Sequence, residues 1–469
     1  MTQMPTLSHP DAPRLADGDR SRQHATLTFL RGAVIALSIA LLAGLLGFIY
    51  YLPGVAPVMQ KLGIEFASLR PIHTTFVTSF VFLAGVGVVH RYFEDIAPPM
   101  GAGERLRTRA QVILWAIAGA GILVSLIGGV FSGREYIGFH PIWSVPILLG
   151  WLLFAWNFFA HLGKGLLCRP VHVTMWTVGM VFFTYTFIEQ HAWMLDRVFA
   201  DPLVDLRVQW KATGTLVGSF NLFVYGSMYY LGVKLSNDES YAYSRLAYAL
   251  FGVGLLNSFT NFGHHTYHLP QNHLVKWISF VISMTEIIIL TRVVWDLSAM
   301  LKSRCPGPAC PVKWFLSAAK WWTGYILATS IVISIPPLNA LIHGTTVVMG
   351  HAMGAMIGID AMVLFAAMTW MTIEIYQRHG YEPTVLESAK FRRWIVGLNI
   401  GVVLLVGSLT IYGLITAGYR YMGLAEPSWA IGSKYFIFAG SGVIAASFFG
   451  KLLDVWGKLL FSSKASPAK

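Results

Sequence analysis

The sequence predicts an all-α integral membrane protein, a bundle of about twelve transmembrane helices. Its mean hydropathy is +0.59, and only 12% of its residues are charged while 55% are hydrophobic. Soluble globular proteins carry about 25% charged residues. Apolar runs recur along nearly the whole chain of 469 residues, and no polar half could fold separately. We therefore expect one membrane domain.

Each expected helix is an apolar run of roughly 20 or more residues bounded by polar or basic residues. Residues 1–27 are polar and lack the apolar and small-residue regions of a cleaved signal, which predicts a tail. A second short tail is expected at 463–469, so the membrane domain would span 28–462. The expected spans are 28–52, 72–92, 110–131, 141–163, 171–190, 208–233, 244–264, 273–297, 315–337, 343–376, 391–418 and 430–460.

Basic residues gather in the loops that this count places on the same side as the two termini. Such clusters are typical of cytoplasmic loops. We therefore expect a multi-pass protein of the bacterial inner membrane with both termini in the cytoplasm, and we attribute the net charge of +12 to topology rather than to a nucleic-acid partner. The clusters contain Arg105, Arg107, Arg109, Lys164, Arg169, Lys302, Arg304, Lys313, Arg392 and Arg393.

The three cysteines, Cys168, Cys305 and Cys310, lie near these cytoplasmic loops. Thiols in that compartment stay reduced, so no disulfide framework is expected. The segment CPGPAC holds two of them, and its Pro and Gly residues favour a flexible loop over a metal site.

Five histidines lie in or beside apolar spans, where an ionisable group is costly and usually functional. By the topology above, all five converge on the periplasmic third of the bundle. They are His73, His264, His265, His343 and His351.

His351 and Met353 are two residues apart on one expected helix, so they point about 200° apart. One helix can therefore ligate two hemes on opposite faces, since imidazole and thioether sulfur are both axial ligands of heme iron. The alternative is that Met353 only fills space, because Met is common in apolar helices. His343, eight residues before His351, would face roughly the same way nearer the surface and suits a hydrogen bond to a heme propionate.

His264 and His265 are adjacent at the end of a span, in FGHHTYHLPQNH. A chain turn there could aim both imidazoles inward at a transition metal. Interfacial histidines of a wet loop are the alternative reading, which suits His268 and His273 better. Glu286 lies mid-span in ISMTEIIIL, and a carboxyl group at that depth predicts proton handling near the metal site.

The strings HGTTVVMGHAM, FGHH, PIHTTF and GREY together resemble the catalytic subunit of heme-copper oxidases. The resemblance runs over roughly residues 30 to 460 and is closest to bacterial nitric oxide reductases of the cytochrome b subunit type and to cbb-type oxidases. It implies two b-type hemes: a low-spin heme with His73 as an axial ligand, and a high-spin heme with His351 as its proximal ligand. It further implies a second metal, iron or copper, at His264 and His265, and a calcium ion at Glu135, for which a surface ion pair with Arg134 is the alternative.

The chain departs from that family pattern at two positions. The family has a histidine where Met353 stands, so the low-spin heme would be ligated by His73 and Met353. The third histidine ligand of the second metal falls on Gly214, and the glutamate that nitric oxide reductases carry one turn later falls near Gly218. Two histidines alone make an open site unless His191, His268 or water completes it, so an empty or differently occupied site remains an alternative.

Glu286 lies 21 residues after His265, the spacing at which nitric oxide reductases carry an active-site glutamate. The seventh span, LLNSFTNFG, lacks the tyrosine that oxygen-reducing members use. The resemblance therefore favours reduction of nitric oxide to nitrous oxide. With no CxxCH motif in the chain and only a short tail before its first span, we expect electrons from a periplasmic or membrane-anchored cytochrome c subunit. The alternatives are an oxygen-reducing cbb-type oxidase, a non-catalytic heme protein for electron transfer or gas sensing, and a twelve-helix transporter without heme.

Overall fold

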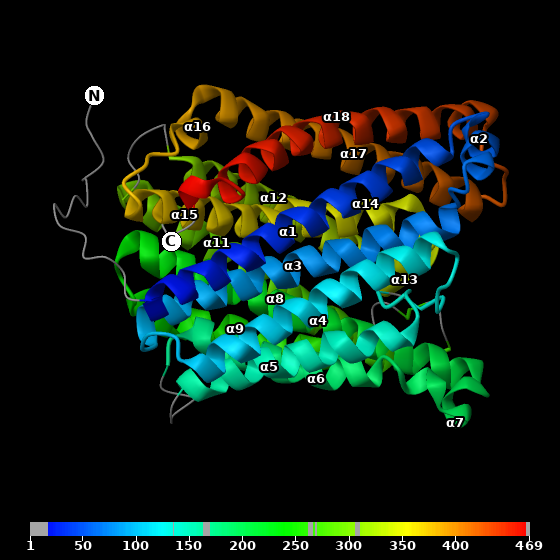
Figure 1. Cartoon of the computed structure of the whole chain (residues 1–469). Helices are drawn as coiled ribbons and strands as arrows, with labels where there is room; N and C mark the ends of the chain where they lie inside the picture. The colour runs from blue at the N-terminus through cyan, green and yellow to red at the C-terminus, as the bar shows by residue number, and fades with distance from the viewer. Residues whose placement is uncertain are drawn as a thin grey trace.

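In a computed structural model the chain is a bundle of long helices, which confirms the predicted fold class. The structure describes residues 17–134, 136–162, 169–260, 266–267, 270–304 and 310–465. The long helices lie side by side with their axes roughly aligned and successive helices running in opposite directions. The two ends of the chain lie at the same end of the bundle (Figure 1). We call this end the terminal face and the other the distal face.

The helices account for all twelve predicted spans. Within the described ranges, nine helices are long and apolar enough to cross a bilayer. The first six spans correspond to α1 (Asp17–Tyr50), α3 (Phe66–Ile96), α4 (Ala102–Ile127), α5 (Ser144–Leu162), α6 (Val171–Glu189) and α8 (Pro202–Ser236). The others are α9 (Arg245–Thr260), α11 (His273–Arg304), α12 (Pro311–Ile333), the run of α14 (Thr346–Ala355), π-helical η5 (Met356–Ala361) and α15 (Met362–Arg378), then α17 (Ala389–Tyr421) and α18 (Ser428–Leu460).

Short helices connect the spans at both faces. At the distal face lie α2 (Val55–Lys61), α7 (Asp196–Phe199) and α13 (Pro336–Ile342), and at the terminal face lies α16 (Thr384–Glu387) (Figure 1). α13 follows α12 after a bend of 96°. Pro336 and Pro337 stand at that bend, and their rings cannot continue a helix from the preceding turn.

Several spanning helices begin earlier than the apolar runs because polar residues cap and extend them. Asp201 caps α8, where its carboxylate accepts hydrogen bonds from the N–H groups of Leu203 and Val204, and Pro202 occupies the first helical position. α1 begins at Asp17, so the predicted boundary between tail and membrane domain at residue 27 falls inside a helix. Arg22 in that helix is buried and pairs with Glu104 of α4 at 2.8 Å.

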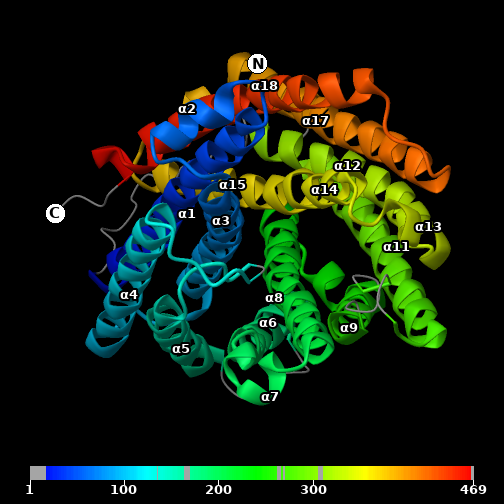
Figure 2. The same ribbon diagram turned by 90° about the vertical axis from the view of Figure 1, so that its right-hand side faces the viewer.

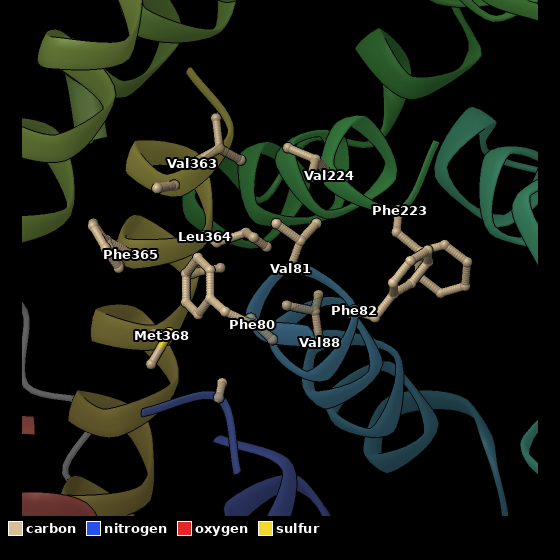
Figure 3. Close-up of a cluster of buried hydrophobic side chains, with 14 of the residues drawn as sticks. Phe80, Val81, Phe82, Val88, Phe223, Val224, Val363, Leu364, Phe365 and Met368 are labelled. Atoms are coloured by element: carbon tan, nitrogen blue, oxygen red, sulfur yellow. The ribbon is translucent and has the colours of Figure 1, made fainter. Parts of the chain in front are cut away.

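The core lies where α3, α8 and α15 meet. Phe80, Val81, Phe82 and Val88 of α3 point toward Phe223 and Val224 of α8 and toward Val363, Leu364, Phe365 and Met368 of α15 (Figure 3). Viewed along the bundle, α14 and α15 lie inside it, with α17 and α18 along one edge and α5 and α6 along the opposite edge (Figure 2). The span that carries His351 and Met353 therefore lies inside the bundle.

A buried network of charges closes the core at the terminal face. The guanidinium group of Arg91, on α3, donates to both carboxylate oxygens of Glu374 on α15, at 2.8 and 2.6 Å, and to Asp95 at 2.7 Å. Asp95 also accepts from the hydroxyl group of Tyr230 on α8, at 2.5 Å. The network thus ties together the same three helices that form the core.

The expectation of reduced cysteines is wrong for Cys310, which is disulfide-bonded in the structure. Cys168 and Cys305 lie outside the described residues. Because Cys310 also forms the N-cap of α12, the bond holds the start of a spanning helix. The sequence offered no local sign of this pairing, since the prediction relied on the compartment alone.

Candidate functional site

His73 lies on α3 against a close approach of α1. Its Nδ1 makes a 2.8 Å hydrogen bond with the backbone carbonyl of Ala40. Gly44, one turn further along α1, leaves the room for this ring, because a Cβ there would lie 2.6 Å from Nδ1. Histidines that bind a metal typically have one ring nitrogen engaged in this way while the other binds the metal. The surroundings of His73 therefore fit an axial ligand whose Nε2 takes the iron.

Met353, on α14, lies on the side of that helix that faces α17 and α18. Its side chain packs against a cluster formed by Leu405, Leu409, Tyr412, Ala430 and Phe438. Phe48 of α1, four residues after Gly44, packs against the same cluster. His73 thus contacts α1 at Ala40 and Gly44, and Met353 packs on a cluster that α1 also contacts through Phe48.

His351, on the same helix, has a buried ring nitrogen that makes no hydrogen bond. Its Nδ1 is buried without a hydrogen-bond partner, although nearly all buried polar atoms of folded proteins have one. Both residues lie within the α-helical segment of this span, so the predicted angular separation of about 200° between His351 and Met353 holds. Gly350 and Gly354 let the helix pack closely on α17 and α12, since a Cβ at each would lie 2.9 Å from Thr410 and Ile326.

The prediction that His343 and His351 share a helix is wrong. His343 is the C-cap of α13, and α14 begins only at Thr346. Gly344 reverses the chain with a φ of 76°, a conformation that glycine adopts readily. The hydroxyl group of Thr345 then caps α14 by accepting from the N–H of Val347 at 3.3 Å. The backbone carbonyl of His343 accepts from Arg420 at 3.1 Å, and a contact of His343 with a heme propionate stays a prediction.

Glu286 lies in the middle of α11 and is buried. One of its carboxylate oxygens accepts a hydrogen bond from the side-chain amide of Asn257 on α9. The amide oxygen of Asn257 in turn accepts from the hydroxyl group of Ser283, at 2.7 Å. The two helices are thus joined by a chain of polar groups inside the bundle.

Beside the Glu286 carboxyl group is an internal cavity of about 20 Å³. That volume holds one water molecule. Polar groups that could bind such a water come from three helices: Tyr225 and Asn221 on α8, Asn257 and Ser258 on α9, and Glu286 on α11. The residues around the cavity are suited to accept, hold and release a proton.

α8 packs closely on α9 at Gly218, where no side chain would fit. A Cβ at Gly218 would lie 2.1 Å from the hydroxyl oxygen of Ser258. The hydroxyl group of Thr215 donates to the carbonyl of Ser258 at 3.1 Å. The absence of a side chain at Gly218 is therefore matched by helix packing, and neither Gly218 nor Gly214 can supply a metal ligand through a side chain.

Several predicted residues lie outside the described part of the chain. These are Glu135, His264, His265 and His268, so the calcium and second-metal sites stay predictions. No group of three His, Cys, Asp or Glu side chains able to hold a metal occurs among the residues that are described. Both ring nitrogens of His191, proposed above as a completing ligand, are engaged, with Ser144 at 2.7 Å and the carbonyl of Phe187 at 2.8 Å.

Arg134, whose ion pair with Glu135 was the alternative to a calcium site, has a carboxylate partner on α8. Arg134 binds both carboxylate oxygens of Asp205 on α8, at 2.8 and 2.7 Å. It also stacks over the ring of Trp193, 4.8 Å from the ring centroid. The cation thus has a carboxylate partner other than its sequence neighbour.

Sequence reasoning missed a second buried carboxyl group, Asp360, in the π-helical segment η5. Within the described ranges, no hydrogen bond or ion pair reaches it. Single π-helical turns are frequent at functional sites. An acid inside the apolar string MIGIDAMVLF is the same signal that identified Glu286.

Comparisons with known proteins agree with this geometry. Residues 24–444 match the family model described as cytochrome c and quinol oxidase polypeptide I. The chain is 26% identical over 373 residues to the cbb3-type cytochrome c oxidase subunit CcoN1 of Stutzerimonas stutzeri, a match that covers 75% of this chain and 74% of that one. Its fold is similar to that of a heme-copper terminal oxidase solved as a dimer by cryo-EM, with a TM-score of 0.69, 16% identity, and coverage of 95% and 84% of the two chains.

Proposed function

Because this chain belongs to the family of cytochrome c and quinol oxidase polypeptide I, the heme-copper oxidase subunit I family of membrane oxidoreductases, we propose that it is a catalytic subunit reducing nitric oxide to nitrous oxide. The reaction combines two NO molecules, two electrons and two protons into one N₂O and one water. The observation that carries this choice is Glu286, a buried carboxyl group beside a cavity the size of one water molecule.

His73 and Met353 would hold the low-spin heme, and His351 the high-spin heme. The heme irons supply one-electron transfer at the first site and an open coordination position for the gas at the second. The hydrogen bond from His73 to the backbone carbonyl of Ala40 orients its ring, and the absence of a side chain at Gly44 leaves room for the ring in that orientation. A heme at His351 would give this buried imidazole a binding partner inside the membrane.

Glu286 would hold and deliver protons for the reaction. Its hydrogen bond with Asn257 fixes the carboxyl group at the edge of the cavity. A water in the cavity would connect it with the phenol group of Tyr225 and the hydroxyl group of Ser258. Such positioned acids contribute typically 10²–10⁴-fold to a rate.

Reduction of oxygen to water is the second candidate, and two observations favour it. The curated relative described above is named a cytochrome c oxidase subunit. Tyr225 of α8 lines the same cavity as Glu286, so a phenol group is present there although the stretch LLNSFTNFG of the seventh span carries none. A third candidate, electron transfer or gas sensing without turnover, is favoured by the missing side chain at Gly214.

Any second metal would be held by His264 and His265, with the α8 ligand absent. Electrons would come from a separate cytochrome c subunit, on the periplasmic side if the terminal face is cytoplasmic. The distal face then lies toward the donor, and His73 lies near that end of α3 while Arg91 lies near the other. Both hemes would thus sit closer to the donor than to the cytoplasm.

The test uses the purified complex with its hemes and a reduced cytochrome c under anaerobic conditions. We expect consumption of NO with formation of N₂O, and we expect Glu286→Gln to lower the turnover by about 10² or more while the heme absorption stays unchanged. Glu286→Asp, which keeps the acid, should retain more activity. Oxygen consumption without NO consumption would favour the second candidate, and two hemes with no turnover of either gas would favour the third.

A further inference from the structure

A long groove on the lipid-facing surface is unrelated to the cavity described above. It lies between α12 and α17 and has a volume of about 760 Å³. Several lining side chains are open to the surroundings: Trp321 is 68% exposed, and Val396, Ile400 and Val403 are each about half exposed. The groove therefore opens toward the bilayer rather than into the bundle.

The groove is charged at one end and apolar along its length. Lys313 and Arg392 lie at its terminal-face end, in the first turns of α12 and α17. None of the described residues that line it is acidic. The N-termini of both helices lie at this end as well, and their dipoles also favour an anion.

Further along, two polar side chains of the groove wall, Asn399 and Trp322, are hydrogen-bonded within the protein. The carboxamide of Asn399 accepts from the indole N–H of Trp322 at 2.8 Å and donates to the carbonyl of Ile395 at 2.9 Å. Trp322 in turn packs against Gly354 and Gly358 of the heme-ligand helix. An occupant of this part of the groove would meet aliphatic and aromatic surface.

The length of the groove matches one leaflet of a bilayer. The lining residues run from Lys313 to Tyr325 on α12 and from Arg392 to Gly407 on α17. At 1.5 Å per residue these stretches are about 18 and 22 Å long. Half of a hydrocarbon core of about 30 Å with its headgroup layer has the same depth, whereas a partner's transmembrane helix would need a groove along the full thickness.

We infer that this groove binds one anionic glycerophospholipid from the leaflet on the side of the chain termini. Its phosphate would lie between Lys313 and Arg392, and its acyl chains would follow the wall from Trp321 toward Gly407. The lipid would cover Trp322, which packs on the helix carrying His351 and Met353. This proposal is independent of the gas that the complex reduces.

The experiment counts lipids retained by the purified, heme-loaded protein. The protein is reconstituted with phosphatidylglycerol, phosphatidylcholine or an equal mixture, and bound lipids are counted by native mass spectrometry. We expect one phosphatidylglycerol to be retained in preference to phosphatidylcholine. Each of Lys313→Gln and Arg392→Gln should lower its retention by about fivefold, since one cation near an anionic lipid contributes about that factor.

Two further variants separate this site from general charge effects. Gly407→Phe places a ring in the groove, where a Cβ meets nothing within 4 Å, and should displace the lipid without disturbing the fold. The double variant Arg109→Gln/Lys451→Gln removes two exposed cations near the terminal face from α4 and α18 and should leave retention unchanged. The heme absorption spectrum checks that each variant is folded.

Three outcomes would overturn the proposal. Equal retention of the two lipids means that the cations do not select the headgroup. Full retention of phosphatidylglycerol in Gly407→Phe and in the Lys313→Gln/Arg392→Gln double variant places the lipid elsewhere. Cross-linking of a photoreactive residue at Val403 to a second polypeptide, with no lipid retained, assigns the groove to a partner subunit.

Discussion

Gly44→Ala tests whether the contact between α1 and His73 holds a heme ligand. The added methyl carbon would lie 2.6 Å from Nδ1 of the imidazole, and an ordinary contact begins at 3.4 Å. The ring must therefore move by about 0.8 Å or α1 must shift, and either change stretches the 2.8 Å hydrogen bond with Ala40 beyond the usual range of about 2.7–3.2 Å.

The magnitude follows from the two effects together. Overpacking of a buried site costs about 1–3 kcal/mol, and loss of one hydrogen bond costs about 0.5–1.5 kcal/mol. A combined cost of about 2 kcal/mol would weaken ligation by His73 roughly 30-fold. We expect the low-spin band in reduced-minus-oxidised spectra to shrink or shift, while carbon monoxide binding at the His351 heme is unchanged.

Gly47→Ala is the matched control, three residues further along the same helix. A Cβ there would meet the Phe66 ring at 3.7 Å, an ordinary contact. This variant should keep the low-spin spectrum and the heme potential of the native protein. If Gly44→Ala gives the same spectrum and potential as Gly47→Ala, then His73 does not ligate a heme in the way argued here.

The remaining predictions concern the charge network, the packing of α8 on α9, and Asp360. Arg91→Met should lower stability by about 1.5–3 kcal/mol in thermal unfolding, because it removes a buried guanidinium group and leaves Glu374 with Arg378 as its remaining partner. Arg292→Met, at a mostly exposed pair, should change it by less than about 1 kcal/mol. Gly218→Ala should lower stability by about 1–3 kcal/mol through its clash with Ser258. Its control, Gly252→Ala, lies in open space on α9 and should raise stability by about 0.5–1 kcal/mol. Equal stabilities of the two variants would contradict the close packing of α8 on α9. Asp360→Asn should remove one protonated-carboxyl C=O stretch from the infrared spectrum, and an unaltered spectrum would mean that this acid is ionised.

The helices could be predicted from sequence because each must bury an apolar run in lipid, and that pattern is local. The ends of the helices could not be predicted in this way. Arg22 belongs to α1 because Glu104 on α4 binds it, and a charge paired with a residue 82 positions away looks like a solvated tail in the sequence.

In the candidate site, too, residues with a local sequence signal could be predicted, and residues whose role depends on packing could not. Imidazoles and acids inside apolar runs can be recognised locally, and this identified His73, His351 and Glu286, with Asp360 overlooked although it carries the same signal. The break at His343 was also visible, since a glycine followed by two threonines favours the end of one helix and the cap of the next. Gly44 gives no such sign, because its role appears only when α3 places an imidazole against it.

The π-helical turn at Met356–Ala361 has a consequence for how this chain tolerates insertions and deletions. Such a turn accommodates one residue more than a turn of α-helix, so deletion of one residue here converts it to an α-helical turn and leaves the downstream residues in nearly the same orientation. The same deletion in the regular helix that follows, α15, would rotate the residues after it by about 100° and turn Glu374 away from Arg91. The tenth span should therefore tolerate the loss of one residue at this turn better than in the half that carries the predicted heme ligands or in the half that packs in the core.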